Sequence, residues 1–186
     1  YVAPLNELLR QLMHPGGTVK PQALDALESL ATSQDDALDV AATIDKLSAG
    51  ADAAQVLALF TQVSDNSKLT LDPDLDSYYI MAIVMDYAPK LAAAAAQADA
   101  ARASVLHESL TAAVKRAIAA NPALARDLAT AELERAHGDE VSKAALSLST
   151  RAAGALDRLL LKRIDGFESH RNRVLGLTLL SLLLAL

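Results

Sequence analysis

Apolar residues recur along nearly the whole chain with the spacing of amphipathic helices. Near the start, four leucines lie at i, i+3, i+4 and i+7 on one face of a helix: Leu5, Leu8, Leu9 and Leu12. We expect this helix to stop near residues 14–17, where a proline and two glycines follow a histidine. No segment of adequate length alternates between apolar and polar residues as a strand does. The pattern therefore predicts an all-α protein.

A second apolar stripe predicts one long helix that opens at Pro21 and ends at Gly50. Proline suits the first helical position, because its missing N–H has no partner there in any case. The stripe consists of Leu24, Leu27, Ala31, Leu38, Ala41, Ile44 and Leu47. On this interpretation the acidic residues at 35, 36 and 39 form a solvated face of the helix.

Aspartates introduce the next two predicted helices. Asp52 can cap a short helix that carries Val56, Leu57, Phe60 and Val63 and ends at 65–67 in a turn or a frayed helix end. Asp72, Pro73 and Asp74 then form a strong helix start. They supply an acceptor at the cap, a proline next to it and acidic residues against the positive end of the helix dipole. We expect Pro89 to kink the helix that follows.

The second half of the chain also reads as helices. The alanine run at 92–96 predicts a closely packed helix face, and Asn121-Pro122 ends the helical pattern that follows it. A further helix is expected to end at Gly138 as its C-cap, and the last helix to run unbroken from Val141 into Val174. Apolar spacings near 3.5 residues predict an elongated, four-helix-like bundle with extra short helices.

Residues 174–186 are an apolar run without charge or proline. A helix needs about 20 apolar residues to cross a bilayer, and this run supplies about thirteen. We interpret it as a truncated membrane span, and the chain as a fragment with an extracytoplasmic domain at 1–170 and the start of a transmembrane helix at 171–186. The alternative is a buried C-terminal helix of a soluble protein.

Composition narrows the class of protein. Hydrophobic residues make up 52% of the chain but aromatic residues only 3%, which favours helices packed through small side chains. A net charge of −6 without a basic stripe argues against nucleic-acid binding. Because the chain has no cysteine, disulfides, thiol catalysis and cysteine-ligated metals are excluded.

The search for catalytic and metal-binding motifs is negative. The histidines, His14, His107, His137 and His170, are scattered, and none has a partner at i+4. A calcium loop beginning at Asp72 would need Gly and Glu where Ser77 and Ile83 stand. No arrangement typical of nucleophilic catalysis or phosphate binding is present. We therefore predict no enzymatic activity in this chain, no cofactor and no metal site.

The segment around Tyr78 and Tyr79 is the strongest candidate for a binding site. It holds two of the four tyrosines, adjacent in the first turns of a predicted helix. Neighbouring helix positions point about 100° apart, so we expect one ring inside and the other toward a groove. Tyrosine hydroxyls and free helix N–H groups suit a small anion. The candidate ligand-binding residues are Asp72, Asp76, Tyr78 and Tyr79; the alternative is that both rings are structural.

At these residues the chain resembles a known family. It is similar to the extracytoplasmic helical sensor region that precedes HAMP linkers in bacterial chemoreceptors, histidine kinases and diguanylate cyclases. Pro15, which follows His14, and Ala82 depart from the pattern at positions where an arginine and an acidic residue are expected. The likeness rests on Tyr1-Val2-Ala3-Pro4-Leu5 with Leu8-Leu9, on Asp72-Pro73-Asp74-Leu75-Asp76-Ser77-Tyr78-Tyr79, and on Leu156-Asp157-Arg158-Leu159-Leu160 with Arg163-Ile164, Arg171 and Arg173.

The resemblance implies the input domain of a membrane-anchored signal-transduction receptor. Such a domain would lie on the periplasmic side of the bacterial inner membrane, bind a small molecule and pass a conformational shift through its C-terminal helix into the membrane. It also implies a homodimer and a downstream output domain, as in chemotaxis. The alternative function is a structural or dimerisation module of a membrane protein with no ligand.

Overall fold

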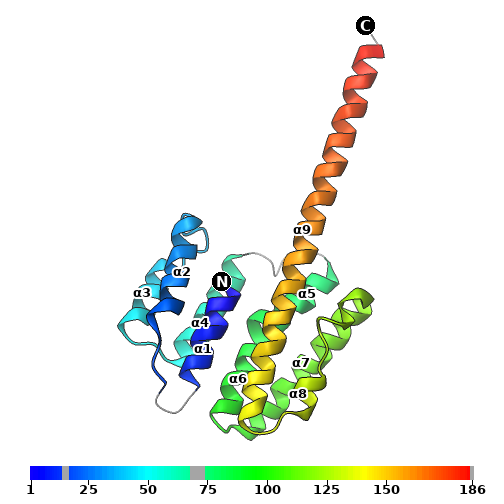
Figure 1. The fold of residues 1–186 in the computed structure, drawn as a ribbon. Helices are drawn as coiled ribbons and strands as arrows, with labels where there is room; N and C mark the ends of the chain where they lie inside the picture. The colour runs from blue at the N-terminus through cyan, green and yellow to red at the C-terminus, as the bar shows by residue number, and fades with distance from the viewer. Residues whose placement is uncertain (14–16, 68–73, 185–186) are drawn as a thin grey trace.

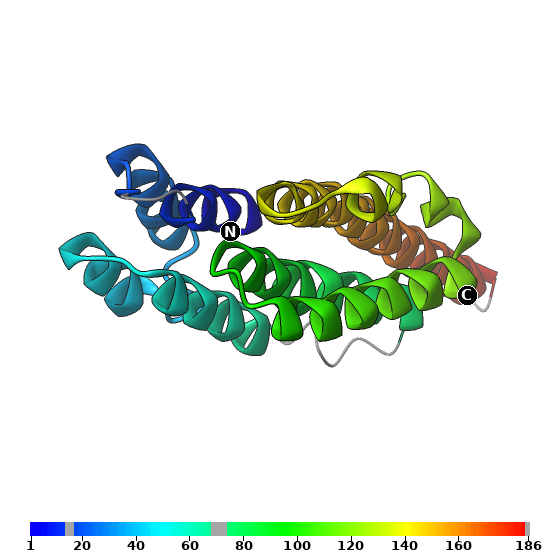
Figure 2. The ribbon, with the colours of Figure 1, turned by 90° about the horizontal axis from the view of Figure 1, so that it is seen from below.

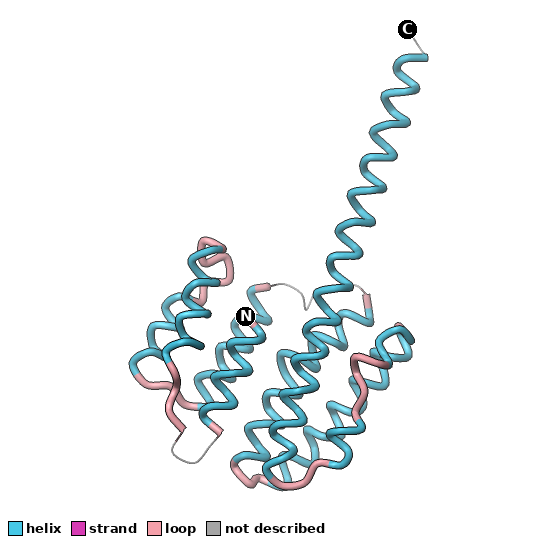
Figure 3. Tube along the Cα trace, in the orientation of Figure 1, coloured by secondary structure: helices cyan, strands magenta, loops and turns pink. Residues whose placement is uncertain are grey.

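The regular structure of the residues that the structure describes is entirely helical. The computed structural model describes the backbone of residues 1–13, 17–67 and 74–184, and side chains up to residue 167 and at 171, 174 and 175. Helices account for 81% of the chain, and the described residues contain no strand (Figure 3). The all-α expectation is confirmed. The helices are α1 (Val2–Leu12), α2 (Pro21–Ser33), α3 (Ala41–Ala49), α4 (Ala53–Asn66), α5 (Leu75–Ala82), the π-helix η2 (Ile83–Tyr87), α6 (Ala88–Ala96), α7 (Ala100–Ala120), the 3-10 helix η3 (Pro122–Ala125), α8 (Ala131–Arg135) and α9 (Asp139–Leu184).

The long helix expected between Pro21 and Gly50 is in fact two helices, so that prediction was wrong. Its first part ends at Ser33, and α3 begins at Ala41. The acidic residues between them do not form a helix face, because three have positive φ: 49° at Asp35, 49° at Asp36 and 50° at 39. The Asp36 carboxylate accepts from the Val40 N–H at 2.7 Å. Aspartate side chains compete in this way for the N–H groups that a continuing helix would use.

Several helix boundaries lie where local chemistry predicts them. Asp52 caps α4 in a reciprocal capping box with Gln55, and α4 ends at Asn66 in the expected turn region. Pro21 is the first residue of α2. Asn121-Pro122 ends α7, since the residue before a proline is disfavoured in the α conformation.

A wider helical turn lies just before Pro89, the position at which we expect a kink. The helix continues without a break from Leu75 to Ala96, and η2 lies just before the proline. The Ala88 N–H donates to the Ile83 carbonyl, five residues back. This π turn accommodates the carbonyl that the ring of Pro89 leaves without an N–H donor. The predicted start at Asp72-Pro73 lies outside the described residues, and α5 begins at Leu75.

Gly138 is not a helix C-cap, which corrects a second boundary. Helix α8 ends at Arg135 with Ala136 as its C-cap, and Gly138 has φ +55° immediately before α9. A left-handed residue at this point lets the chain reverse from α8 into α9, a conformation that favours glycine. The prediction of one uninterrupted last helix is confirmed, because α9 comprises 46 residues.

The helices form an elongated body around α6. Helix α6 contacts α7, α9, α4 and α1, and α5 contacts α7 and α9. Figure 2 shows α1 and α9 side by side, facing α4, α6 and α7. The hairpin of α2 and α3 packs at one side, against α1 and α4. Figure 1 shows the C-terminal part of α9 projecting beyond all the other helices.

The alanine run allows α6 to lie close to its neighbours. Ala92 is fully buried, and its carbonyl accepts a hydrogen bond of 2.8 Å from the buried Ser142 hydroxyl of α9. A backbone carbonyl is reached in this way only where the side chains between two helices are small. A second buried polar link joins α1 to α9, where the Asn6 amide donates to the Ser149 hydroxyl at 3.2 Å.

One described helical stretch, Leu75–Ala96, is long and apolar enough to cross a membrane. Within the protein, however, 61% of this window is buried against other helices. That burial is typical of the core helix of a helical domain. The predicted span at 171–186 is a different segment. Its backbone is helical to Leu184, and most of its side chains lie outside the described residues.

Candidate functional site

The structure places Asp76, Tyr78 and Tyr79 in the first turns of α5, between α7 and α9. Asp72, the fourth residue predicted for the site, lies outside the described residues. The three described residues point in two directions. Asp76 is directed toward α9, and the two tyrosines line a hollow against α7.

Asp76 is the centre of a polar junction that joins three segments of the chain. One carboxylate oxygen accepts from the Arg163 guanidinium of α9 at 2.6 Å, and the other accepts from the Asn121 amide at 2.9 Å. Asn121 lies at the end of α7. Arg163 also pairs with Asp74 at 3.1 Å and donates to the Ser77 hydroxyl at 3.0 Å. The start of α5 is therefore tied to the end of α7 and to the middle of α9.

The junction is partly shielded from water, and its hydrogen bonds change the acidity of Asp76. The Asp76 side chain is 15% exposed and the Arg163 side chain 23%. Burial alone raises the pKa of Asp76, but the hydrogen bonds from Asn121 and the Ser77 N–H, together with Arg163, outweigh it and hold the pKa below its ordinary value. The carboxylate is thus held in its charged, hydrogen-bonded form.

A hollow of about 330 Å³ lies beside the junction, and three of the four tyrosines line it. Tyr78 and Tyr79 come from α5 and Tyr87 from η2, while Ser109 and Arg116 come from α7. The small side chain of Ala82 forms part of the wall. The hollow, called the tyrosine hollow below, has the size of a small-molecule site and presents hydroxyl groups and one guanidinium.

The two adjacent tyrosines share this hollow, contrary to the expectation that they face different ways. Their ring centroids are 5.3 Å apart in an edge-to-face arrangement. Tyr78 is 43% exposed, and Tyr79 is partly buried against the core. The long tyrosine side chains lean toward each other from diverging Cα–Cβ directions, and the edge-to-face contact stabilises that arrangement.

Arg116 is the only charged residue among the described residues that line the tyrosine hollow. Its guanidinium lies 5.7 Å from the centroid of the Tyr79 ring, in the range of a cation–π contact. Within the described residues Arg116 has no carboxylate partner. An anion entering the hollow would therefore find a cation that no acidic side chain has already neutralised.

Sequence reasoning missed the partners that complete this site. Arg163 and Asn121 bind Asp76 across 87 and 45 residues of sequence, and no local spacing signals such a pair. Arg116 comes from another helix, α7, whereas Tyr87 lies about two turns after Tyr79 on the same continuous helix. The signal available in the sequence was that tyrosine is rare in this chain. Among the described residues, no group of three or more His, Asp or Glu side chains is arranged to hold a metal ion.

Comparison of the chain with protein-family models, with curated proteins and with solved structures found no match. Function is therefore inferred from the geometry of this chain.

Proposed function

We propose that the chain is the ligand-sensing input domain of a bacterial membrane-anchored signal-transduction receptor. In this role it carries no catalytic activity of its own, and any enzymatic output would belong to another domain. A small organic acid binds in the tyrosine hollow, and α9 passes the resulting shift into the membrane.

The observation that carries this proposal is the Asp76–Arg163 ion pair of 2.6 Å. Asp76 lies in the same turns of α5 as Tyr78 and Tyr79, so a ligand that moves these turns also moves the carboxylate. Arg163 lies in the middle of α9, where it bonds to the start of α5, and Figure 1 shows the C-terminal part of this helix projecting beyond the other helices. The pair connects the tyrosine hollow to the long helix. A ligand that binds one arrangement of this contact more tightly than another shifts the population of α9 positions.

The chemistry of the tyrosine hollow favours an organic acid over other small molecules. A carboxylate can pair with Arg116, and the tyrosine and serine hydroxyls can donate hydrogen bonds to its oxygens. Tyrosine faces accept the hydrocarbon part of such a ligand. Among the described residues no acidic side chain lines the hollow, and Arg116 repels a cationic ligand there.

The arrangement of the helices supports a periplasmic domain between two membrane spans. Figure 1 places the start of α1 toward the end of the body from which α9 projects. A chain leaving a membrane, forming a four-helix-like bundle and returning to the same membrane would have both ends on that side. Residues 1–170 are then the sensor domain on the periplasmic side of the inner membrane. Residues 171–186 continue α9 into the bilayer.

We expect Arg116→Gln to weaken binding of the best organic acid by about 1.5–3 kcal/mol, because it removes a charge-assisted hydrogen bond. Tyr78→Phe should weaken it by about 0.5–1.5 kcal/mol, since one hydroxyl donor is lost. Melting temperatures should hardly change, because Arg116 and Tyr78 are both exposed. A thermal-shift screen of organic acids and amino acids identifies the ligand, and calorimetric titration measures its affinity.

Arg126→Gln is the matched control for this experiment. Arg126 is exposed and does not line the hollow, so its replacement removes the same charge without touching the site. Unchanged affinity in the Arg116, Tyr78 and Tyr79 variants would exclude the hollow as the ligand site. If the tyrosines are purely structural, Tyr79→Phe should instead lower the melting temperature and leave signalling intact.

A second function, a structural dimerisation module without a ligand, is favoured by the outer part of α9. Leu160, Ile164, Phe167 and Val174 recur at intervals of four, three and seven positions, the spacing of a coiled-coil seam. Leu160 is half-buried against the core, but Ile164 is 54% and Phe167 75% exposed, so this outer part of the seam is uncovered within the described part of the chain. A second copy of the same helix would cover it, which supports a homodimer in either function.

We expect the chain in detergent to sediment as a dimer, and Phe167→Glu to weaken its association at least about tenfold. In a parallel pair the two introduced carboxylates would face each other across the seam. Val105→Glu provides the control, because Val105 is 64% exposed on α7, away from the seam. A wild-type chain that sediments only as a monomer would count against the dimer, as would equal effects of the two substitutions.

A further inference from the structure

A second and larger hollow, of about 620 Å³, lies between α6, α7 and the start of α9. It is lined by the end of α6, the first turns of α7 and the turn that leads into α9. Figure 1 shows these segments at the end of the body opposite to the projecting part of α9. This hollow, called the distal hollow below, shares no lining residue with the tyrosine hollow.

The wall of the distal hollow is mainly apolar and is built from small side chains. Leu91 forms its buried base, and Val141 of α9 is half-buried beside it. Most of the remaining apolar lining is alanine, including Ala95 and Ala103. Because alanines leave room where larger residues would fill the angle between helices, a hydrocarbon group can enter and be removed from water.

The rim of the distal hollow is acidic. Asp99, Glu108 and Asp139 contribute exposed carboxylates, and no lysine or arginine of the described chain lines it. Glu108 and Asp139 have no hydrogen-bond or ion-pair partner among the described residues. Asp99 accepts the Arg102 N–H at 3.1 Å as the cap of α7. The mouth of the hollow therefore carries negative charge that no cation of the lining neutralises.

An inorganic cation does not suit this arrangement. The acidic side chains are spread around the mouth, and no three potential ligands in the described chain are grouped closely enough to hold a metal ion. A ligand that uses both the apolar wall and the acidic rim has to carry hydrocarbon and positive charge together. A carboxylate ligand of the kind suited to the tyrosine hollow would be repelled here.

We propose that the distal hollow binds an amphipathic organic cation, such as an alkyl or arylalkyl ammonium. Its hydrocarbon part lies against Leu91, the alanines and Val141, and its ammonium group lies at the rim near Glu108 and Asp139. The half-buried His107 lines the same hollow and in its neutral form accepts a hydrogen bond from the ammonium. Bound in this way, the ligand links the first turn of α9 to α7.

The test is calorimetric titration of the full chain at low ionic strength with three probes of equal length: hexylammonium, 1-hexanol and hexanoate. We expect hexylammonium to bind at least about fivefold more tightly than hexanol, because only the former meets the acidic rim. Added salt should reduce this difference, since the carboxylates are exposed. The double variant Glu108→Gln and Asp139→Asn should bring hexylammonium to the level of hexanol without changing the helix content.

Ala103→Leu fills the distal hollow and should weaken the binding of both hexylammonium and hexanol. This variant therefore distinguishes binding in the hollow from binding to detergent or to the end of α9. Circular dichroism checks that this variant folds. Arg126→Gln, at an exposed residue that lines neither hollow, serves as the control and should leave hexylammonium binding unchanged. Binding of hexanoate, if lost in Arg116→Gln alone, belongs to the tyrosine hollow. The proposal is overturned if hexylammonium fails to bind at millimolar concentration, binds no better than hexanol, or binds equally well to the double variant.

Discussion

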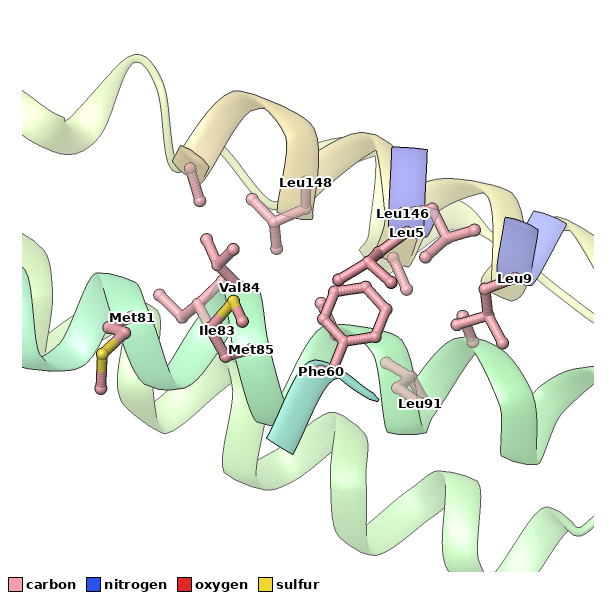
Figure 4. Close-up of a cluster of buried hydrophobic side chains, with 14 of the residues drawn as sticks. Leu5, Leu9, Phe60, Met81, Ile83, Val84, Met85, Leu91, Leu146 and Leu148 are labelled. Carbon is pink, nitrogen blue, oxygen red and sulfur yellow. The ribbon is translucent and has the colours of Figure 1, made fainter. Parts of the chain in front are cut away.

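Replacing Phe60 with alanine is expected to lower the free energy of unfolding by about 3–5 kcal/mol. The Phe60 side chain is fully buried on α4. Figure 4 shows its ring among side chains from α1, η2 and α6, the helices that α4 contacts. Deleting the ring removes its burial and leaves a cavity that these helices can close only in part. Since α4 joins the α2–α3 hairpin to the rest of the core, the loss affects both parts.

The other phenylalanine of the chain provides a matched control. Phe167 is 75% exposed on α9, so Phe167→Ala should change the free energy of unfolding by less than about 0.5 kcal/mol. Urea denaturation followed by circular dichroism measures both variants. Two protein concentrations are used, because association through α9 would make the Phe167 result depend on concentration. Similar losses in the two variants would contradict the described core.

Arg163→Met is expected to lower the free energy of unfolding by about 1–3 kcal/mol at neutral pH. It leaves the Asp76 carboxylate, which is only 15% exposed, without its cation. The hydrogen bonds from Asn121 and the Ser77 N–H remain, which limits the loss. Adding Asp76→Asn to this variant should recover part of the stability, since the partly buried side chain is then neutral and the other acidic partner of Arg163, Asp74, is 58% exposed to water. A double-mutant cycle measures the coupling.

The same pair predicts a dependence of stability on pH. Because the pKa of Asp76 is lowered in the folded protein, its stabilising contribution is complete above the pKa of the unfolded chain. It is lost as the pH falls through the lowered pKa of the folded state. Asp76→Asn should therefore reduce the loss of stability in acid. The pKa of Glu7 is also lowered, by its hydrogen bond with Arg10. Glu7 is present in both the wild type and the Asp76→Asn variant, so its contribution cancels when the two are compared. If the stability of the wild type and of Asp76→Asn fell equally in acid, the result would argue against the Asp76–Arg163 pair.

Local chemistry explains which boundaries could be predicted from the sequence. Pro21, Asp52 and Asn121-Pro122 act on their own turn of the chain, and each marks an end of a helix as expected. The sequence prediction placed Asp36 on the face of one long helix, and this was wrong. The apolar stripe is equally compatible with one continuous helix and with two helices joined by a turn between 34 and 40. The turn is decided by a carboxylate that competes for two N–H groups, and apolar periodicity does not report that competition.

The candidate site was predictable only in part, for a different reason. Tyr78, Tyr79 and Asp76 lie close together in the sequence, and two adjacent tyrosines are conspicuous in a chain with few aromatic residues. Arg116 and Arg163 are ordinary basic residues on helices, and their importance comes from where α7 and α9 pack. That packing depends on alanines such as Ala92, which let two helices approach closely. The presence of an alanine in the sequence does not indicate which helix will be its neighbour.

Because α9 is long, a tilt of this helix at Arg163 becomes a larger movement at its far end. Helix α9 contains no proline, and its backbone stays helical for 21 further positions, from Arg163 to Leu184. At 1.5 Å per residue this arm is about 30 Å long. Pivoting the arm by about 5° around Arg163 would move its far end sideways by about 3 Å, somewhat more than the typical shift of a helix at an interface of about 1–2 Å. A shift of less than 1 Å beside Asp76 that tilts α9 therefore becomes a larger movement at the far end of the helix. A shift of α9 along its own axis reaches that end with its size unchanged.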